Sequence, residues 1–272
     1  MLTLDGVRHL AIARQPANAV HLRQAATGDD YAICIQALQG LSWLRRRDEA
    51  SFIAGYLTDD DARIRVCAAK ALALTGIGDA EAQALNTSLR RDPSSEVQAA
   101  CMRTLSWLGA IDDLSVQRYL TKTEPGEVIE AALQAVERLA LGRCIPSVIP
   151  YLTAQRPTHR QYAARALSTF EPNDVWSHLA TMTDDDDPEV RAIVLRFLGK
   201  ANIPNTAPII AQALNDPNPG VRATAAIALG TLGDPRYLTA ILSQQHERHP
   251  EVRLRLKETA SRLRFVRDDG GH

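Results

Sequence analysis

One helical pattern recurs along this chain with a period of 31 residues. It begins at an aliphatic anchor, often followed by Arg, and continues with small apolar residues four and seven positions later and then two leucines. Six of the seven intervals between anchors are 31 residues long and one is 33. The eight anchors are Ile33, Ile64, Val97, Val128, His159, Val190, Val221 and Val252. A fixed period of this length is typical of repeat arrays, in which each repeat buries its apolar face against the next one.

Each repeat is predicted to be a pair of antiparallel helices. In the copy that ends at Gly233, apolar residues have helical spacing over 207–214, and a second helix over 221–232 follows the run Asn-Asp-Pro-Asn-Pro. We expect Asp216 to cap this second helix and the prolines to stand at its start. Four glycines are predicted to end second helices in the left-handed conformation: Gly76, Gly109, Gly142 and Gly233.

The whole chain is predicted to form a single solenoid over 1–272. We expect an N-terminal cap helix at 1–15, repeats over 16–264 and a charged C-terminal tail at 265–272. Hydrophobic residues make up 45% of the chain and aromatic residues only 5%. This balance favours packing between helices rich in Ala and Leu over a β-sandwich.

The segment 216–235, with the sequence DPNPGVRATAAIALGTLGDP, resembles the short HEAT repeat of the phycobilisome-lyase type, also called the EZ repeat. Residues 92–109 and 185–199 are similar to it, with more departures. The resemblance covers nearly the whole chain, and the copy at His159 departs most because its anchor is polar. It implies an all-α fold, a right-handed α-α superhelix of about eight HEAT-like helical hairpins.

The resemblance also implies a ladder of ion pairs along the stack. In such repeats, an Asp before the second helix and an Arg at the second position of that helix support each other. Gln98 and Ile129 replace the Arg, and Thr123 and Ala154 replace the Asp, so we expect the ladder to be interrupted in the middle of the array. The matching residues are Asp59, Asp92, Asp185 and Asp216, with Arg65, Arg160, Arg191, Arg222 and Arg253.

The period also separates residues that build the stack from residues that are free to bind. With the anchor numbered zero and 100° per residue, positions 0, 4, 5, 7, 8 and 11 form the apolar face of each second helix. Position 6 lies opposite, with positions 3 and 10 beside it, and in HEAT-like stacks this face lines the concave groove. The candidate binding residues on it are Trp43, Lys70, Arg103, Trp107, Arg138, Tyr162, Arg165, Arg196, Lys200 and Arg262.

Two interpretations of this face are open. Arg and Trp are enriched at binding hot spots, which favours a groove that binds a partner. Alternatively, the long Arg side chains only solvate a helix face and the tryptophans cover neighbouring repeats.

Catalytic chemistry is not expected. The four aspartates at 184–187 stand before a helix and lack the ligand spacing of a calcium loop, so they are interpreted as helix caps. One family of HEAT-like di-iron hydroxylases uses several His-Glu pairs, and this chain has the single pair His246-Glu247. The four cysteines show no CxxC spacing and are interpreted as inert thiols. We therefore expect no catalytic residue, no metal and no cofactor.

These observations predict a non-catalytic scaffold that binds an acidic or amphipathic segment of a protein partner in its concave groove. The first alternative is a nucleic-acid-binding protein similar to the HEAT-like DNA glycosylases, which the net charge of −1 disfavours. The second is a bilin lyase or chaperone subunit, because the repeat type is named after such proteins. No signal peptide or membrane span is evident, so we expect a cytoplasmic protein that does not bind membranes. The sequence does not identify the partner or the oligomeric state.

Overall fold

The computed structural model describes residues 2–121, 123–201, 203, 206–244 and 246–269, without the side chains of 267–269. Every regular element within these ranges is an α-helix or a short 3₁₀ helix. The chain divides into two compact units, Met1–Ser147 and Val148–His272, and each is described by itself. The predicted all-α fold of stacked helical hairpins is confirmed in each unit.

The first unit contains four hairpins that follow one lone helix, α1. The hairpins pair α2 with α3, α4 with α5, α6 with α7, and α8 with α9. Short 3₁₀ helices extend the first helix of several hairpins. The bounds are α1 Leu4–Ala13, η1 Pro16–Asn18, α2 Ala19–Ala26, α3 Tyr31–Trp43, η2 Arg47–Glu49, α4 Ala50–Gly55, η3 Tyr56–Thr58, α5 Ala62–Thr75, α6 Asp79–Arg91, α7 Ser95–Trp107, α8 Asp113–Gln117, α9 Gly126–Leu139, η4 Gly142–Cys144 and α10 Ile145–Val148.

The second unit continues the same alternation of a short first helix and a longer second helix. Here η5 packs on α11, and the hairpins that follow pair α12 with α13, α14 with α15, and α16 with α17. The bounds are η5 Ile149–Thr153, α11 Pro157–Leu167, α12 Pro172–Ala180, α13 Pro188–Ala201, α14 Ala207–Gln212, η6 Ala213–Asn215, α15 Pro219–Leu232, η7 Pro235–Tyr237, α16 Leu238–Ser243 and α17 Pro250–Asp269. Helix α17 therefore extends into the tail expected at 265–272, and residues 270–272 lie outside the description.

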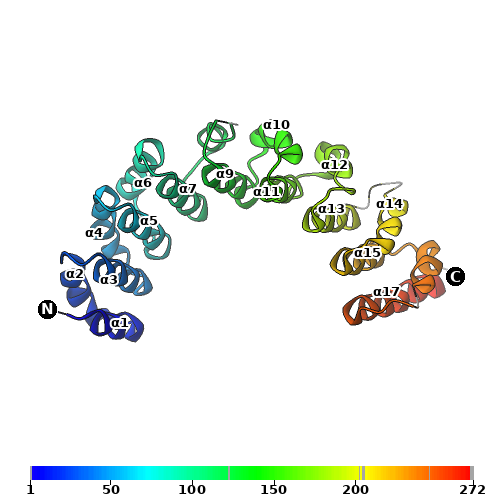
Figure 1. Cartoon of the computed structure of the whole chain (residues 1–272), viewed down its shortest axis with the longest axis horizontal. Helices are drawn as coiled ribbons and strands as arrows, with labels where there is room; N and C mark the ends of the chain where they lie inside the picture. The colour runs from blue at the N-terminus through cyan, green and yellow to red at the C-terminus, as the bar shows by residue number, and fades with distance from the viewer. Residues whose placement is uncertain (1, 122, 202, 204–205, 245, 270–272) are drawn as a thin grey trace. The chain divides into compact units, whose positions relative to one another are not determined.

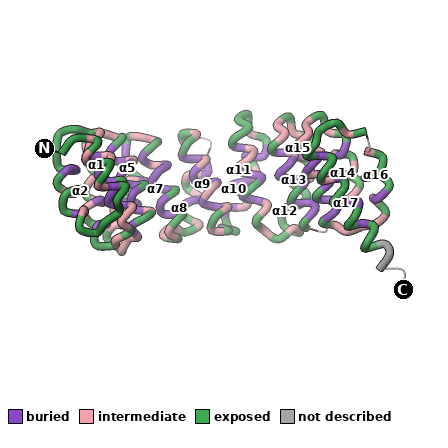
Figure 2. The backbone as a smooth tube through the Cα atoms, turned by 90° about the horizontal axis from the view of Figure 1, so that it is seen from below, coloured by how far each residue is buried: buried purple, intermediate pink, exposed green. Residues whose placement is uncertain are grey.

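Within each unit the helices form two layers. In the first unit, α3, α5 and α7 lie on one side and α2, α4 and α6 on the other, and the second unit separates α13 and α15 from α12 and α14 in the same way (Figure 1). Each second helix also packs on the second helix of the next repeat in its unit. Buried residues recur in every second helix (Figure 2). We call the row of second helices the second-helix layer.

Small residues let neighbouring second helices approach closely. A Cβ atom built on Gly199 in α13 would lie 2.7 Å from the Cβ of Ala228 in α15. A Cβ on Gly230 in α15 would lie 3.0 Å from the Thr259 hydroxyl oxygen of α17, and that hydroxyl donates to the Ala226 carbonyl oxygen at 2.9 Å. Close packing of this kind joins one repeat to the next without a large side chain between them.

The predicted ladder exists, and four of its arginines bind a carboxylate of the next repeat. Each guanidinium makes a bidentate ion pair and also donates through Nη1 to two backbone carbonyl oxygens that precede its own helix. The shorter distance in each pair joins Nε to a carboxylate oxygen: 2.7 Å for Arg65 to Asp92, 2.8 Å for Arg160 to Asp185, 2.8 Å for Arg191 to Asp216 and 2.6 Å for Arg222 to Glu247.

The ladder is interrupted where the sequence predicts it. Gln98 donates only to the Asp92 carbonyl oxygen at 2.9 Å, which replaces the backbone contact of an Arg but not its ion pair. Ile129 is buried, and its aliphatic side chain cannot form an ion pair. One ladder pair therefore lies in the first unit and three lie in the second.

Three predicted details at helix ends are wrong. Gly142 does not end α9; the left-handed residue there is Ala140, with φ of 50°, and Gly142 instead begins η4. Asp216 does not cap α15, because the Asn218 side chain accepts from the amides of Gly220 and Val221. Asp216 is instead used by Arg191 in the ladder. Gly233 adopts the predicted left-handed conformation and Gly109 has a positive φ of 67°, whereas Gly76 combines φ of 76° with ψ of 158° and so ends α5 outside the left-handed helical region.

Candidate binding surface

The ten predicted binding residues divide equally between the two units. Trp43, Lys70, Arg103, Trp107 and Arg138 belong to the first unit. Tyr162, Arg165, Arg196, Lys200 and Arg262 belong to the second. All lie on second helices, and eight are exposed, whereas Trp43 and Tyr162 are half-buried.

In the first unit, α7 and α9 bring together two pairs of side chains. Trp107 at the end of α7 is 58% exposed, and the guanidinium carbon of Arg138 in α9 lies 4.3 Å from its ring centroid. One turn earlier on each helix, Arg103 Nε donates to Gln134 Oε1 at 3.1 Å. The two pairs are in register because residues four apart share a helix face.

Helix α5 extends this surface with Lys70 and Leu74, which are both exposed and have the same four-residue spacing. We call the five residues Lys70, Leu74, Arg103, Trp107 and Arg138 the Trp107 patch. It combines three cations with an exposed indole ring and an aliphatic side chain. The cation–π contact holds the ring and the guanidinium beside each other at the surface.

Trp43 has a different environment from Trp107. Its ring lies 5.7 Å from the guanidinium carbon of Arg14, which follows α1 in the left-handed conformation. The residue is half-buried at the end of α3, so part of its surface is already covered within the protein. This partial cover agrees with the alternative interpretation for Trp43.

In the second unit, three predicted residues line one hollow between α11 and α13. Arg165, Arg196 and Lys200 surround it, and its volume is about 330 Å³. Arg196 also meets Glu189 at 3.2 Å, but both side chains are about half exposed, so this pair restrains the arginine only weakly. We call this site the basic hollow, and its other lining residues are Ser168, Phe170, Pro172, Ile193, Phe197 and Ala201.

Sequence reasoning missed the aromatic part of the basic hollow. Phe197 stands at position 7 of its repeat, which is a core position, and Phe170 stands at position 11. Both contribute to the lining because α11 ends at Leu167, and the chain then turns toward α12. Tyr162 and Arg262 are not part of this lining.

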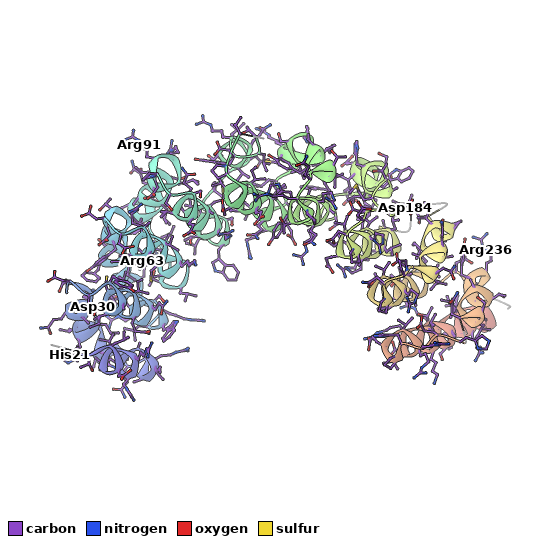
Figure 3. All side chains as sticks on the ribbon, viewed as in Figure 1. His21, Asp30, Arg63, Arg91, Asp184 and Arg236 are labelled. Carbon is purple, nitrogen blue, oxygen red and sulfur yellow. The ribbon has the colours of Figure 1, made fainter. Side chains whose placement is uncertain are left out.

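The other candidate chemistry is structural. Asp187 caps α13 by accepting from the amides of Glu189 and Val190, and Asp185 binds Arg160 in the ladder. Asp184 lies beside these residues in the second unit, where Figure 3 labels it. No group of three His, Cys, Asp or Glu residues suited to a metal ion occurs within the described part of the chain.

All four cysteines are buried. Burial raises the pKa of the Cys67 and Cys101 thiols to about 12 and that of the Cys34 and Cys144 thiols to about 11. Since the thiolate is the reactive form, these side chains are inert at neutral pH. Across the described residues, no helix combines the length and apolar character that crossing a lipid bilayer requires.

Comparison with solved structures supports the same architecture. The YibA protein of Escherichia coli is similar with a TM-score of 0.72 and 17% identity, over 94% of this chain and 96% of that one. An engineered protein matches with a TM-score of 0.52 and 18% identity, over 98% of this chain and 88% of that one. The complex of CpcE and CpcF of phycocyanin lyase from Nostoc sp. PCC7120 matches with a TM-score of 0.52 and 18% identity, over 90% of this chain and 94% of that one. At these identities the likeness concerns the fold alone.

No curated protein sequence matches the chain. The family model for HEAT repeats matches residues 19–106 and 177–260, which together make up more than half of it. The bidentate ladder and the two-layer stack of hairpins agree with that match. The chain belongs to the HEAT-repeat family.

Proposed function

We propose that the protein is a non-catalytic scaffold that binds an acidic or amphipathic segment of a partner protein on its second-helix layer. The observation that carries this proposal is the Trp107 patch, in which an indole ring 58% exposed to solvent lies against Arg138 and beside Arg103. An exposed Trp with flanking arginines is the composition of a protein-binding hot spot. The basic hollow supports it with three further cations on the same layer of the second unit.

The charges of the two surfaces define the partner's chemistry. The Trp107 patch contains Lys70, Arg103 and Arg138, and the basic hollow contains Arg165, Arg196 and Lys200, whereas Glu189 is the one carboxylate paired with any of them among the described residues. Carboxylates of a partner are therefore attracted to both surfaces. The Trp107 ring and Leu74 add an apolar contact, so a segment with both acidic and apolar residues fits best.

The same surfaces do not favour nucleic acid. Binding to a phosphate backbone normally requires a surplus of basic charge, and this chain has 31 basic against 32 acidic residues. The similarity to the phycocyanin lyase complex concerns the fold at 18% identity and supplies no pigment chemistry here.

The proposal is tested by reversing three charges, with Arg103→Glu, Arg165→Glu and Arg196→Glu in one protein. Partners captured by the wild-type and triple-variant proteins are quantified by mass spectrometry. We expect the variant to lose the captured partner by at least about tenfold, while its helicity and thermal unfolding remain unchanged because all three side chains are exposed.

A matched control reverses three exposed arginines that lie outside the second helices: Arg91 in α6, Arg118 after α8 and Arg236 in η7. This control changes the net charge by the same amount but leaves both binding surfaces unaltered. It should therefore retain the partner. Equal loss in both triple variants, or retention in both, would contradict the assignment of binding to the second-helix layer.

A further inference from the structure

The last hairpin of the second unit has a basic and apolar hollow on the side of α17 that no other described repeat covers. Its volume is about 430 Å³, and α16 and α17 both line it. Leu242 is 44% exposed there, and Leu256 and Ala260 lie deeper. The charged lining residues are Arg253, Lys257 and Arg264.

One repeat earlier, the equivalent face is covered, so the chain itself shows what binds such a surface. The residues of α15 that correspond to Arg253, Lys257 and Ser261 are Arg222, Ala226 and Gly230. Arg222 binds the Glu247 carboxylate, while the carbonyl oxygen of Ala226 accepts from Thr259 and Gly230 packs against that residue. A helical hairpin with a carboxylate on its connecting loop therefore completes this face.

Helix α17 keeps the features that join one repeat to the next. Arg253 holds the ladder position, yet none of the ion pairs found among the described residues includes it. Ser261 keeps the small side chain that allows close approach. The Arg253 side chain is exposed, whereas the equivalent Arg222 is held by Glu247 of the next repeat.

A charge distinguishes the terminal face from the internal ones. Lys257 stands at position 5 of its repeat, where the seven earlier copies have only apolar residues, namely Leu38, Ala69, Met102, Leu133, Ala164, Leu195 and Ala226. Arg264 stands where the preceding copy has Gly233. The terminal face therefore has more positive charge than the faces between repeats, which favours an acidic occupant.

We propose that this face binds an amphipathic helix of a partner protein, with one carboxylate on Arg253 and a second acidic residue near Lys257 or Arg264. The apolar side of that helix covers Leu242, Leu256 and Ala260. The surface is distinct from the Trp107 patch and the basic hollow, so the inference goes beyond the proposed function and does not depend on it.

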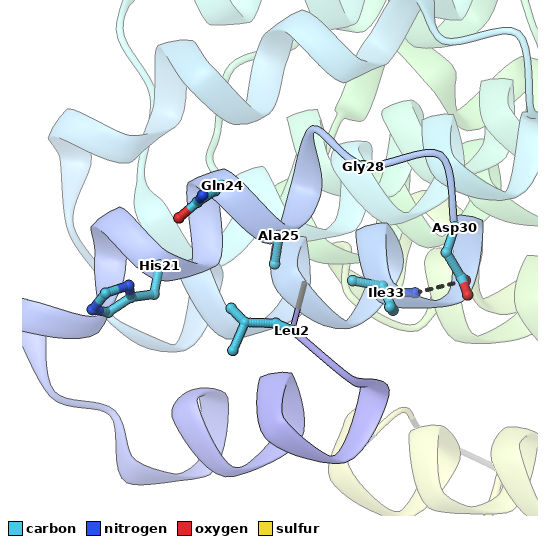
Figure 4. A pocket seen from close by; sticks show the side chains of 7 residues that line it. All are labelled: Leu2, His21, Gln24, Ala25, Gly28, Asp30 and Ile33. Atoms are coloured by element: carbon cyan, nitrogen blue, oxygen red, sulfur yellow. Dashed lines mark hydrogen bonds between the residues drawn. The ribbon is translucent and has the colours of Figure 1, made fainter.

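A second copy of this chain is a poorer occupant, because its N-terminal hairpin lacks the ladder carboxylate. Gly28 holds the position, five residues before the anchor Ile33, at which Asp216 and Glu247 stand in their repeats. A hollow beside this hairpin is lined by residues that include His21, Gln24 and Asp30 (Figure 4). Asp30 is its acidic residue, and it already accepts from the amides of Ala32 and Ile33 to cap α3.

The test uses the full chain and a synthetic peptide with the sequence of residues 234–266, held helical over the α17 segment by a side-chain lactam. In the native structure this segment packs on the equivalent face of α15, and it contains Glu247, which pairs with Arg222. Binding is measured by fluorescence anisotropy. We expect Arg253→Ala in the protein, or Glu247→Gln in the peptide, to weaken binding by about tenfold, since each removes a charge-assisted bidentate contact.

A peptide with Thr259→Glu places an acid opposite Lys257, because Thr259 meets the equivalent Ala226 in the native stack. Lys257→Glu in the protein should weaken the binding of this peptide, whereas Arg236→Glu, an exposed change elsewhere in the unit, should leave it intact. Circular dichroism checks that each variant remains folded. Binding that survives Arg253→Ala shows that the peptide has replaced the native hairpin on α15 and overturns the proposal, as does no binding at millimolar peptide. Self-association of the full chain that Arg253→Ala abolishes would assign the face to a second copy and also overturn it.

Discussion

At the scale of single residues, the ladder shows how one arginine joins two repeats. Arg222 binds Glu247 across the repeat boundary and the carbonyl oxygens of Asp216 and Pro217 within its own repeat. A guanidinium has enough N–H donors in one plane to bind the carboxylate and the carbonyl oxygens at once, whereas the ammonium group of a lysine does not. The ladder arginines therefore hold the loop before each second helix as well as the adjacent hairpin.

Glu247 gives the pH dependence of this contact. The hydrogen bond from Arg222 lowers the pKa of Glu247 from 4.5 to about 2. Because the pKa is lower in the folded than in the unfolded state, the stabilisation is complete above pH 4.5 and is lost as the pH falls toward 2. We expect Glu247→Gln to lower the free energy of unfolding by about 2 kcal/mol at pH 7, measured by urea denaturation.

The difference between wild type and Glu247→Gln should shrink as the pH is lowered from 5 toward 2. Glu251→Gln is the control, since Glu251 makes an exposed pair with Arg255 and its loss should change stability by less than about 0.5 kcal/mol. If the difference in free energy of unfolding between wild type and Glu247→Gln stayed constant down to pH 2, it would contradict the assigned ion pair.

The sequence predicted the ladder arginines better than their partners. Arg222 follows its anchor directly, so the period identifies it, and the resemblance to EZ repeats implies its role. Glu247 was interpreted only as half of a His-Glu pair, because it is a Glu at a position where four of the seven earlier copies have Asp. Asn218 was missed as a cap because Asp216, two residues before it, is an equally good capping residue in isolation.

At the scale of helices, stability depends on how closely the second helices approach. Gly199→Ala should destabilise the protein, because the added methyl group would lie 2.7 Å from the Ala228 Cβ atom and 2.8 Å from its Cα atom. Overpacking of this kind costs about 1–3 kcal/mol, which exceeds the gain of about 1 kcal/mol from the better helix propensity of Ala. Thermal and urea unfolding measure the net change.

Gly55→Ala is the matched control. Gly55 lies at the end of α4 with nothing within 4 Å of an added Cβ atom. The substitution should therefore stabilise the protein by about 0.4–1 kcal/mol. If both substitutions changed stability in the same direction, close packing between α13 and α15 would not be the cause.

Helical periodicity predicts which face of a second helix is apolar but not how its end is built. The period correctly assigned positions 0, 4 and 8 to the core, because every copy packs the same face of its second helix against neighbouring helices. It could not predict that Ala140 ends α9 in the left-handed conformation, since nothing in its side chain favours that state over Gly142 two residues later.

At the scale of the whole molecule, each repeat depends mainly on its neighbours, as expected for a solenoid. Arg191→Gln removes the ion pair with Asp216 in the second unit. Hydrogen exchange followed by mass spectrometry should show faster exchange in α13 to α15, with exchange in the first unit unchanged. Equal acceleration in both units would show that the chain unfolds as one cooperative body.

The sequence predicted a single array over 1–272, and the residues themselves explain why its division into two units is harder to foresee. Gln98 and Ile129 indicate that the ladder is interrupted, but an interruption in one set of contacts does not specify where packing is weakest. That depends on the sum of contacts made by short elements such as α8, α10 and η5, whose lengths the period does not encode.

The ladder also bears on how such a chain can change its length. Each bidentate pair in the second unit joins an arginine to an acid 25 residues further on, so the donor and acceptor of one contact belong to successive copies. If the 31 residues from 191 to 221 were duplicated in tandem, Asp216 of the first copy would meet the first Arg191, and the acid of the second copy would meet the second. Both new ladder contacts would form without any compensating substitution. The ladder therefore tolerates the gain or loss of a 31-residue repeat by unequal recombination, whereas the close packing at Gly199 would change, because the duplicated repeat would place a second Phe197 where Ala228 now lies.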